Sequence, residues 1–116
     1  MARRAPANLL DYVPTRILEH TLETDGSVVI LKPKFGTGPI SRLMKRIVGR
    51  RDILRVHLDP IGSLTWESID GRRTVGDIAE HVRDRSEDGL EDAYERCARF
   101  MRSLADAGAV RLDPPV

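Results

Sequence analysis

The sequence predicts an α+β domain of winged-helix-like type, in which a three-stranded antiparallel sheet packs against three α-helices. The chain has 116 residues and is 41% hydrophobic, which is enough for one modest core. Extended, β-rich segments bounded by turn residues occupy the part before residue 59. Helical spacing of apolar residues and helix-end signals follow it. Strands followed by helices, rather than alternating with them, are typical of the α+β class.

Three strands are expected in the first half. Two lie at about 17–23 and 27–32, because Asp25-Gly26 separates two β-rich runs and Asp-Gly is a strong hairpin signal. The third lies at about 53–58, where apolar residues alternate with Arg55 and His57.

The first two helices are expected from the residues at their ends. Asp59 can cap a helix that begins with Pro60, where no backbone donor is needed, and the Asp-Gly pair at 70–71 closes it. Thr74, with Asp77 three residues later, resembles a capping box and begins the second helix.

The third helix is expected from about Leu90 to Ala107. Its apolar stripe includes Cys97, which is interpreted as a small buried residue rather than a nucleophile. Gly108 ends this helix, and residues 109–112 can form a short final strand.

The chain divides into an N-terminal arm at 1–15, a domain at 16–112 and a tail at 113–116. Within the domain, residues 33–51 are predicted to be an insertion with a short basic amphipathic helix at 40–50. The net charge of +1 conceals +6 on residues 1–58 and −5 on the rest. The negative charge follows from helix-end chemistry, and the positive charge gathers in the insertion.

Catalysis finds little support among the residues. His20, His57 and His81 have no ligand spacing, and Cys97 is the only cysteine. The stretch 36–41 lacks the Gly-Lys-Ser/Thr ending of a phosphate loop. We therefore expect no metal, no cofactor and no enzymatic activity.

Composition also bears on partners and location. A pI of 8.0 and helices of mixed charge argue against nucleic acid as a partner. A lone cysteine, no signal peptide and no long apolar run favour a cytoplasmic protein.

Two features favour binding of a peptide. The strand at 53–58 can lie at a sheet edge and accept an extended peptide as an added strand. Arginines of the third helix can flank a groove beside that edge; they are Arg96, Arg99 and Arg102. The alternative is that the arm or a second copy of the chain covers the edge, so a homodimer remains a second expectation.

A run of residues in the first two helices resembles the signature of the PqqD family, the coenzyme PQQ synthesis protein D group. The pattern is L-D-x-x-G-x-x-x-W-x-x-x-D-G-x-x-T-V-x-x-I. The chain matches it at Leu58, Asp59, Gly62, Trp66, Asp70, Gly71, Thr74, Val75 and Ile78. The likeness covers roughly residues 16–112, and the arm and the insertion depart from the compact family pattern.

The resemblance implies a non-enzymatic recognition element, or peptide chaperone, for ribosomally made, post-translationally modified peptides. Such a domain captures the leader of a precursor peptide by strand addition and presents it to a modifying enzyme, often a radical-SAM protein. The pathway would be PQQ synthesis or a related one. The peptide-binding residues implied here are Ile53, Leu54, Arg55, Val56, His57, Arg96, Arg99 and Phe100.

A second hypothesis concerns the basic helix at 40–50. Basic side chains beside an apolar stripe suit an anionic membrane surface or a scaffold partner. The same apolar residues can instead pack on the domain, and this interpretation makes a membrane surface the less favoured partner.

Overall fold

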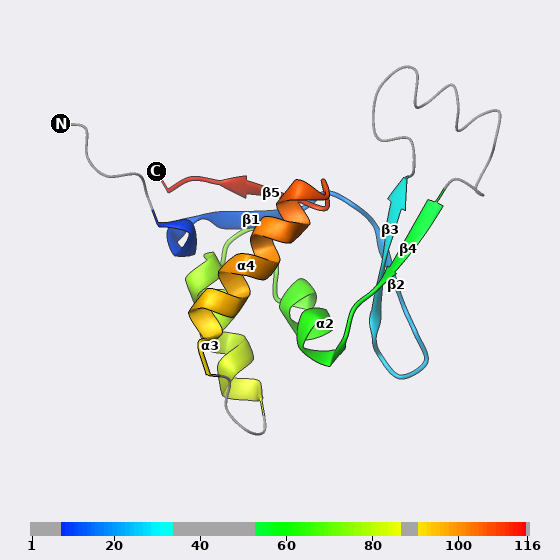
Figure 1. The fold of residues 1–116 in the computed structure, drawn as a ribbon, viewed down its shortest axis with the longest axis horizontal. Helices are drawn as coiled ribbons and strands as arrows, with labels where there is room; N and C mark the ends of the chain where they lie inside the picture. Colours follow the sequence, from blue (N-terminus) through cyan, green and yellow to red (C-terminus); the bar gives the residue numbers. More distant parts are fainter. Residues whose placement is uncertain (1–7, 34–52, 87–90, 116) are drawn as a thin grey trace, which may run out of the picture.

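The computed structural model describes residues 8–33, 53–86 and 91–115 (Figure 1). These residues form three α-helices, a three-stranded antiparallel sheet and a two-stranded sheet, which confirms the α+β class. The predicted insertion helix at 40–50 and residues 1–7 of the predicted arm lie outside the described residues. In chain order the elements are η1 (Leu9–Asp11), β1 (Val13–Arg16), β2 (His20–Leu22), β3 (Val28–Pro33), β4 (Ile53–His57), α2 (Pro60–Glu67), α3 (Val75–Arg85), α4 (Ala93–Asp106) and β5 (Val110–Asp113).

The three-stranded sheet has the order β2-β3-β4. Its first two strands form the predicted hairpin, although β2 is shorter than the expected strand at 17–23. Gly26 has a φ of +89°, and the Ser27 amide donates to Asp25 Oδ1 at 2.9 Å. The Asp-Gly signal therefore acts as expected, because glycine takes positive φ without steric cost.

The two-stranded sheet differs from the prediction. Residues 9–15, expected in an N-terminal arm, form η1 and most of β1, and β1 pairs antiparallel with β5. The final strand expected at 109–112 is present as β5, but it joins β1 rather than the larger sheet. Pro14 is buried in β1. Proline is tolerated in this strand because the strand has only one partner.

The helix ends follow the sequence closely. Asp59 Oδ1 accepts from the Gly62 amide at 2.6 Å and caps α2, with Pro60 as its first residue. Thr74 and Asp77 form a capping box on α3, each side chain accepting from the other's backbone amide. Both caps satisfy amides that the helices leave without intrahelical partners.

The core lies among the three helices, β3 and the start of β5. Trp66 of α2 and Met101 of α4 are fully buried at its centre. The sheet is joined to α2 through Ser63, whose hydroxyl accepts from the Val28 amide at 2.9 Å and donates to the Leu58 carbonyl at 3.3 Å. This buried hydroxyl fixes the end of β4 against the first helix.

Candidate functional site

Strand β4 lies at the edge of its sheet. Its inner side faces β3, with Val56 opposite Ile30 and the Leu58 amide donating to the Val28 carbonyl at 2.9 Å. Backbone groups alternate in direction along an antiparallel strand. Even-numbered residues of β4 therefore direct their amides and carbonyls toward β3.

The alternate residues of β4 face the other way. The amides and carbonyls of Arg55 and His57 point away from β3, and no strand of the described segments pairs with that side. An edge of this kind can form main-chain hydrogen bonds with another extended chain. The prediction that 53–58 lies at a sheet edge is confirmed for Ile53–His57.

The side chains of β4 divide between the two faces of the sheet. Leu54 and Val56 share the face of Ile30, whose side chain packs into the core, yet they are 46% and 40% exposed. Arg55 and His57 lie on the opposite face. The core-side face of the sheet therefore continues as an exposed apolar strip along its edge.

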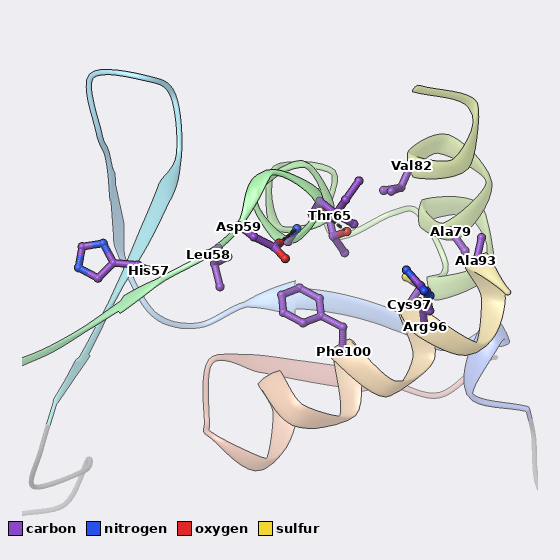
Figure 2. Close-up of a pocket in the computed structure, with 12 residues that line it drawn as sticks. His57, Leu58, Asp59, Thr65, Ala79, Val82, Ala93, Arg96, Cys97 and Phe100 are labelled. Atoms are coloured by element: carbon purple, nitrogen blue, oxygen red, sulfur yellow. Dashed lines mark hydrogen bonds between the residues drawn. The ribbon is translucent and has the colours of Figure 1, made fainter. Parts of the chain in front are cut away.

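A pocket of about 390 Å³ opens beyond the carboxyl end of β4, between α2, α3 and α4 (Figure 2). Phe100 extends from α4 toward Leu58 and Asp59, while Ala79 and Val82 approach from α3. The lining residues are His57, Leu58, Asp59, Ile61, Gly62, Thr65, Ala79, Val82, Ala93, Arg96, Cys97 and Phe100.

Small residues keep this pocket open. Gly62, Ala79 and Ala93 supply the wall positions from three helices. A Cβ added at Gly62 would lie 2.9 Å from Asp59 Oδ1 and 3.5 Å from Phe100 Cζ. Glycine at this position therefore permits the close contact with the capping carboxylate, whereas the contact with the Phe100 ring would be an ordinary one.

One arginine of α4 lines the pocket, and a second lies in a neighbouring hollow. Arg96 and Phe100 line both this pocket and a shallower hollow that also includes Arg99 and Ser103. Arg99 pairs with Glu95 at 2.8 Å, with both side chains well exposed. Arg96 is exposed and forms no ion pair with any residue of the described ranges. Of the two arginines, Arg96 therefore has the positive charge that no described carboxylate neutralises.

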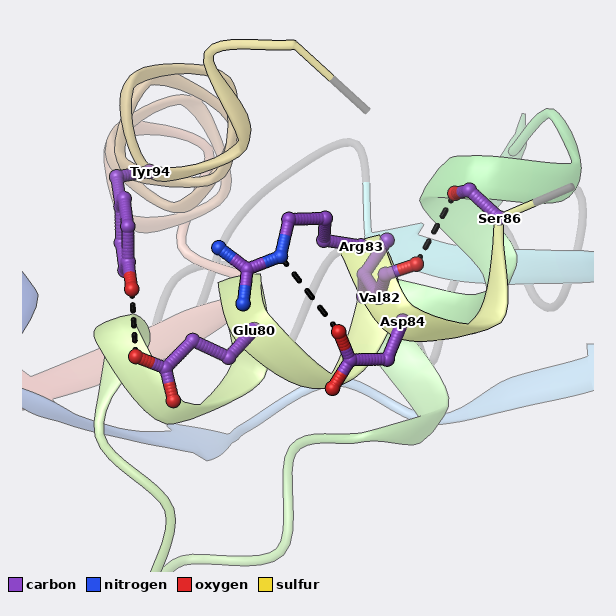
Figure 3. Close-up of polar contacts among 6 residues, drawn as sticks. All are labelled: Glu80, Val82, Arg83, Asp84, Ser86 and Tyr94. Carbon is purple, nitrogen blue, oxygen red and sulfur yellow. Dashed lines mark hydrogen bonds and ion pairs between the residues drawn. The ribbon is translucent and has the colours of Figure 1, made fainter. Parts of the chain in front are cut away.

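Polar contacts on the outer face hold α3 beside α4 (Figure 3). The Tyr94 hydroxyl donates to Glu80 Oε2 at 2.5 Å, and this contact raises the pKa of Tyr94 because the neutral phenol is the donor. The Arg83 guanidinium lies 5.9 Å from the centre of the Tyr94 ring. These contacts stabilise the spacing of the two helices that form the pocket wall.

Cys97 lies in the pocket wall and is 7% exposed. Burial raises the pKa of its thiol to about 11, and Sγ lies 3.6 Å from the Val75 carbonyl. The group is therefore a neutral thiol near pH 7, as expected for a buried small residue and not for a nucleophile.

Three of the eight predicted site residues, His57, Arg96 and Phe100, line the pocket. The His57 ring itself points away from the other lining side chains (Figure 2). Arg99 borders the neighbouring hollow, while Ile53 and Arg55 line neither. The helix-facing walls, which include Ala79, Val82, Ala93 and Cys97, were not predicted, because apolar residues at helical spacing are also typical of a filled core. Their small size was the one available signal.

The ranges that the structure describes were also searched for a metal site and for a membrane-spanning helix. His, Cys, Asp and Glu side chains there form no group of three suited to a metal ion. No helix among them combines the length and hydropathy needed to cross a bilayer. His20 is half-buried, and its ring centre lies 5.8 Å from that of Trp66.

The fold and the site define a small α+β domain with an exposed strand edge beside an apolar pocket. The family model described as Coenzyme PQQ synthesis protein D (PqqD) matches residues 52–110, and the chain belongs to that family. The match spans about half of the chain and includes β4, the three helices and the first residue of β5. The comparison with curated proteins found no match.

Family membership suggests a peptide-binding role related to PQQ biosynthesis. PqqD proteins are non-catalytic, chaperone-like accessories that interact with a peptide and with PQQ synthesis enzymes.

Proposed function

We propose that this chain captures the leader of a precursor peptide by strand addition to β4 and presents it to a separate modifying enzyme of radical-SAM type. The domain would act as a winged-helix-like peptide-recognition element in PQQ synthesis or a related peptide pathway. The enzyme would carry the chemistry, and this chain would supply affinity and position.

The observation that carries the proposal is the outward direction of the Arg55 and His57 backbone groups at the open side of β4. A peptide strand placed there would form hydrogen bonds with these backbone groups. Its alternate side chains would then lie beside Leu54 and Val56 on the same face of the sheet and extend this strip. Backbone pairing of this kind is tolerant of sequence, so side-chain contacts must select the peptide.

Charge supports an acidic leader. Arg96 and Arg99 lie on α4 beside Phe100, in the lining of the pocket and in the adjoining hollow. Positive charge beside a binding edge favours peptides with Asp or Glu, and it speeds their association at low salt.

A pair of proline variants tests strand addition. Arg55→Pro removes an amide that points outward, whereas Val56→Pro removes one that pairs with β3. Proline is tolerated at an edge where the lost amide faces solvent. We therefore expect Arg55→Pro to fold normally and bind about 2- to 10-fold more weakly, the effect of one lost hydrogen bond. Val56→Pro should destabilise the sheet itself.

The binding partner for calorimetry is each short peptide encoded beside the gene for this chain. Arg55→Ala is the matched control, because it keeps the amide and removes a side chain on the far face of the sheet. Amide shifts confined to α4, or equal affinity for the Arg55→Pro variant and the native chain, would contradict strand addition. Light scattering separates peptide binding from pairing of two copies through the same edge.

A further inference from the structure

We infer that the peptide-binding edge extends past the end of β4 to the backbone amide of Asp59, and that Ser63 is the positioning residue that directs this amide. This extension rests on the proposed function and specifies what the bound strand must supply. Opposite Asp59, the peptide has to offer a carbonyl only. Opposite Arg55 and His57, it needs both a carbonyl and an N–H group.

The backbone stays extended beyond the last residue of β4. The strand ends at His57, and Asp59, which caps α2, has a φ of −73° and a ψ of 176°. These angles are extended, so backbone groups keep alternating in direction as far as Asp59. Figure 2 shows Leu58 and Asp59 on the stretch that leads from β4 into α2. Asp59 thus continues the series of Arg55 and His57, which face away from β3.

A side-chain hydroxyl is inserted into the ladder where β4 ends. The Leu58 amide donates to the Val28 carbonyl at 2.9 Å, as in a regular antiparallel pair. The return connection passes through Ser63, whose Oγ accepts from the Val28 amide at 2.9 Å and donates to the Leu58 carbonyl at 3.3 Å. The buried hydroxyl therefore holds the Leu58 carbonyl on the inner side of the strand, toward β3 and α2.

The direction of the Leu58 carbonyl fixes that of the Asp59 amide. The peptide unit between the two residues is trans, and the C=O and N–H groups of such a unit point in opposite directions. Because the carbonyl points inward, the Asp59 N–H points to the open side of β4. Among the residues that the structure describes, no backbone carbonyl accepts from this amide.

Asp59 offers a donor to the open side without an acceptor. Its carbonyl accepts from the Ser63 amide at 2.8 Å in the first turn of α2, and the next residue, Pro60, has no amide. A peptide residue opposite His57 exchanges two hydrogen bonds with the edge, one in each direction. The residue opposite Asp59 forms one, through its carbonyl. A peptide residue that lacks an N–H group, such as proline, therefore loses no hydrogen bond at this position.

Amide-to-ester replacement in a bound peptide tests this asymmetry with the native chain. The probe is a peptide selected for binding to the full chain from a random display library. An ester removes the N–H of the residue after it and weakens the carbonyl of the residue before it. The ester directly after the residue opposite Asp59 should weaken binding about 2- to 10-fold, the effect of one hydrogen bond. The ester directly before that residue should leave the affinity unchanged.

Hydrogen exchange of single amides, followed by NMR, establishes the register of the same complex. Binding should protect the amides of Arg55, His57 and Asp59. The ester after the residue opposite Asp59 should remove the protection of the Asp59 amide. In an antiparallel peptide this ester lies two residues before the one that releases the His57 amide. An equal loss of affinity from the ester before that residue would overturn the inference.

Ser63→Ala tests the positioning role, and Ser68→Ala is the matched control. Both serines are buried, but the Ser68 hydroxyl donates at 2.7 Å to the Leu64 carbonyl of its own helix and does not contact β4. Only Ser63→Ala should weaken peptide binding and reduce the protection of the Asp59 amide, with both variants compared under conditions where they are folded. Equal affinities of the two variants would overturn the role of Ser63. The ester experiment uses the native chain and is independent of how either variant folds.

The extension and strand addition fail in different ways. Binding that protects the amides of Arg55 and His57 but not that of Asp59 would leave strand addition intact and overturn the extension. Binding that protects none of the three amides would overturn strand addition and the extension with it. Absence of any binder in the selection would also overturn both.

Discussion

The helical half of the molecule and strand β4 are adjacent in the chain but differ in how their apolar residues are used. Each of the three helices buries a large side chain completely, namely Trp66, Ile78 and Met101. In β4, four of the five residues are exposed, and two of these, Leu54 and Val56, are apolar. The helices bury these three side chains, whereas β4 leaves both a backbone edge and an apolar strip uncovered by any described residue.

The difference separates the residues that identify the fold from those that can select a partner. Signature positions such as Asp59, Trp66 and Thr74 cap helices or fill the core. None of the five residues of β4 belongs to the buried core cluster. Exposed apolar side chains on an open edge favour pairing with another strand, and this supports the proposed function.

Truncation of the core tryptophan should produce the largest effect. Trp66→Ala removes a fully buried side chain and should lower the free energy of unfolding by ~3–5 kcal/mol. Leu54→Ala, at a site that is 46% exposed, should change it by no more than ~0.5 kcal/mol. Urea denaturation followed by circular dichroism measures both. Similar losses for the two variants would mean that β4 supports the core after all.

High pH should weaken the helical half through Cys97. Its pKa is raised from an ordinary 9.0 to about 11, so the unfolded chain loses this proton first. Stability is then fully present below about pH 9 and falls as the pH rises toward about 11, by up to about 2–3 kcal/mol. Urea midpoints at about pH 8 and about pH 10.5 measure the fall. Cys97→Ala is the control, and an equal fall in that variant would assign the effect to other groups.

Removing the cap of α3 should have an intermediate effect. Thr74→Ala deletes the hydroxyl that accepts from the Asp77 amide at 3.0 Å and should lower the free energy of unfolding by ~1 kcal/mol. Peptide affinity should remain unchanged, because the cap lies outside the pocket. Thr74→Ser keeps the hydroxyl and should restore most of the stability in the same urea experiment. A loss of affinity in Thr74→Ala at full stability would extend the binding surface beyond β4 and α4 to the start of α3.

Local chemistry made the helix ends and the hairpin predictable. Asp59, Thr74 and Gly26 act through groups no more than three residues away, so sequence alone reveals them. β1 was missed because its partner β5 lies at the other end of the chain, and no local periodicity reports such pairing. Contacts of this kind depend on the assembled fold.

The candidate site was only partly predictable for a related reason. Alternation predicted the strand at 53–58, which could lie at a sheet edge, and helical spacing placed Arg96 and Phe100 on α4. A pocket, however, is space that side chains leave empty. Ala79 and Cys97 have the same spacing whether their helices close completely or, as here, leave room beside Gly62. Only the packing of three helices distinguishes the two arrangements.

The smallest change in stability is expected at the exposed arginines of α4. Their effects on peptide affinity should differ. Arg99 pairs with Glu95 at a surface site, where such pairs contribute ~0.3–0.5 kcal/mol, and Arg96 has no ion-pair partner among the described residues. Arg99→Gln and Arg96→Gln should therefore both leave the urea midpoint almost unchanged. Affinity for an acidic peptide should fall further in Arg96→Gln, because Arg96 lines the pocket and Arg99 is already paired. Titrations at low and high salt measure the contrast, which should diminish as salt screens the rim charge. A larger loss of affinity in Arg99→Gln would instead place the charged contact in the neighbouring hollow and not at the pocket.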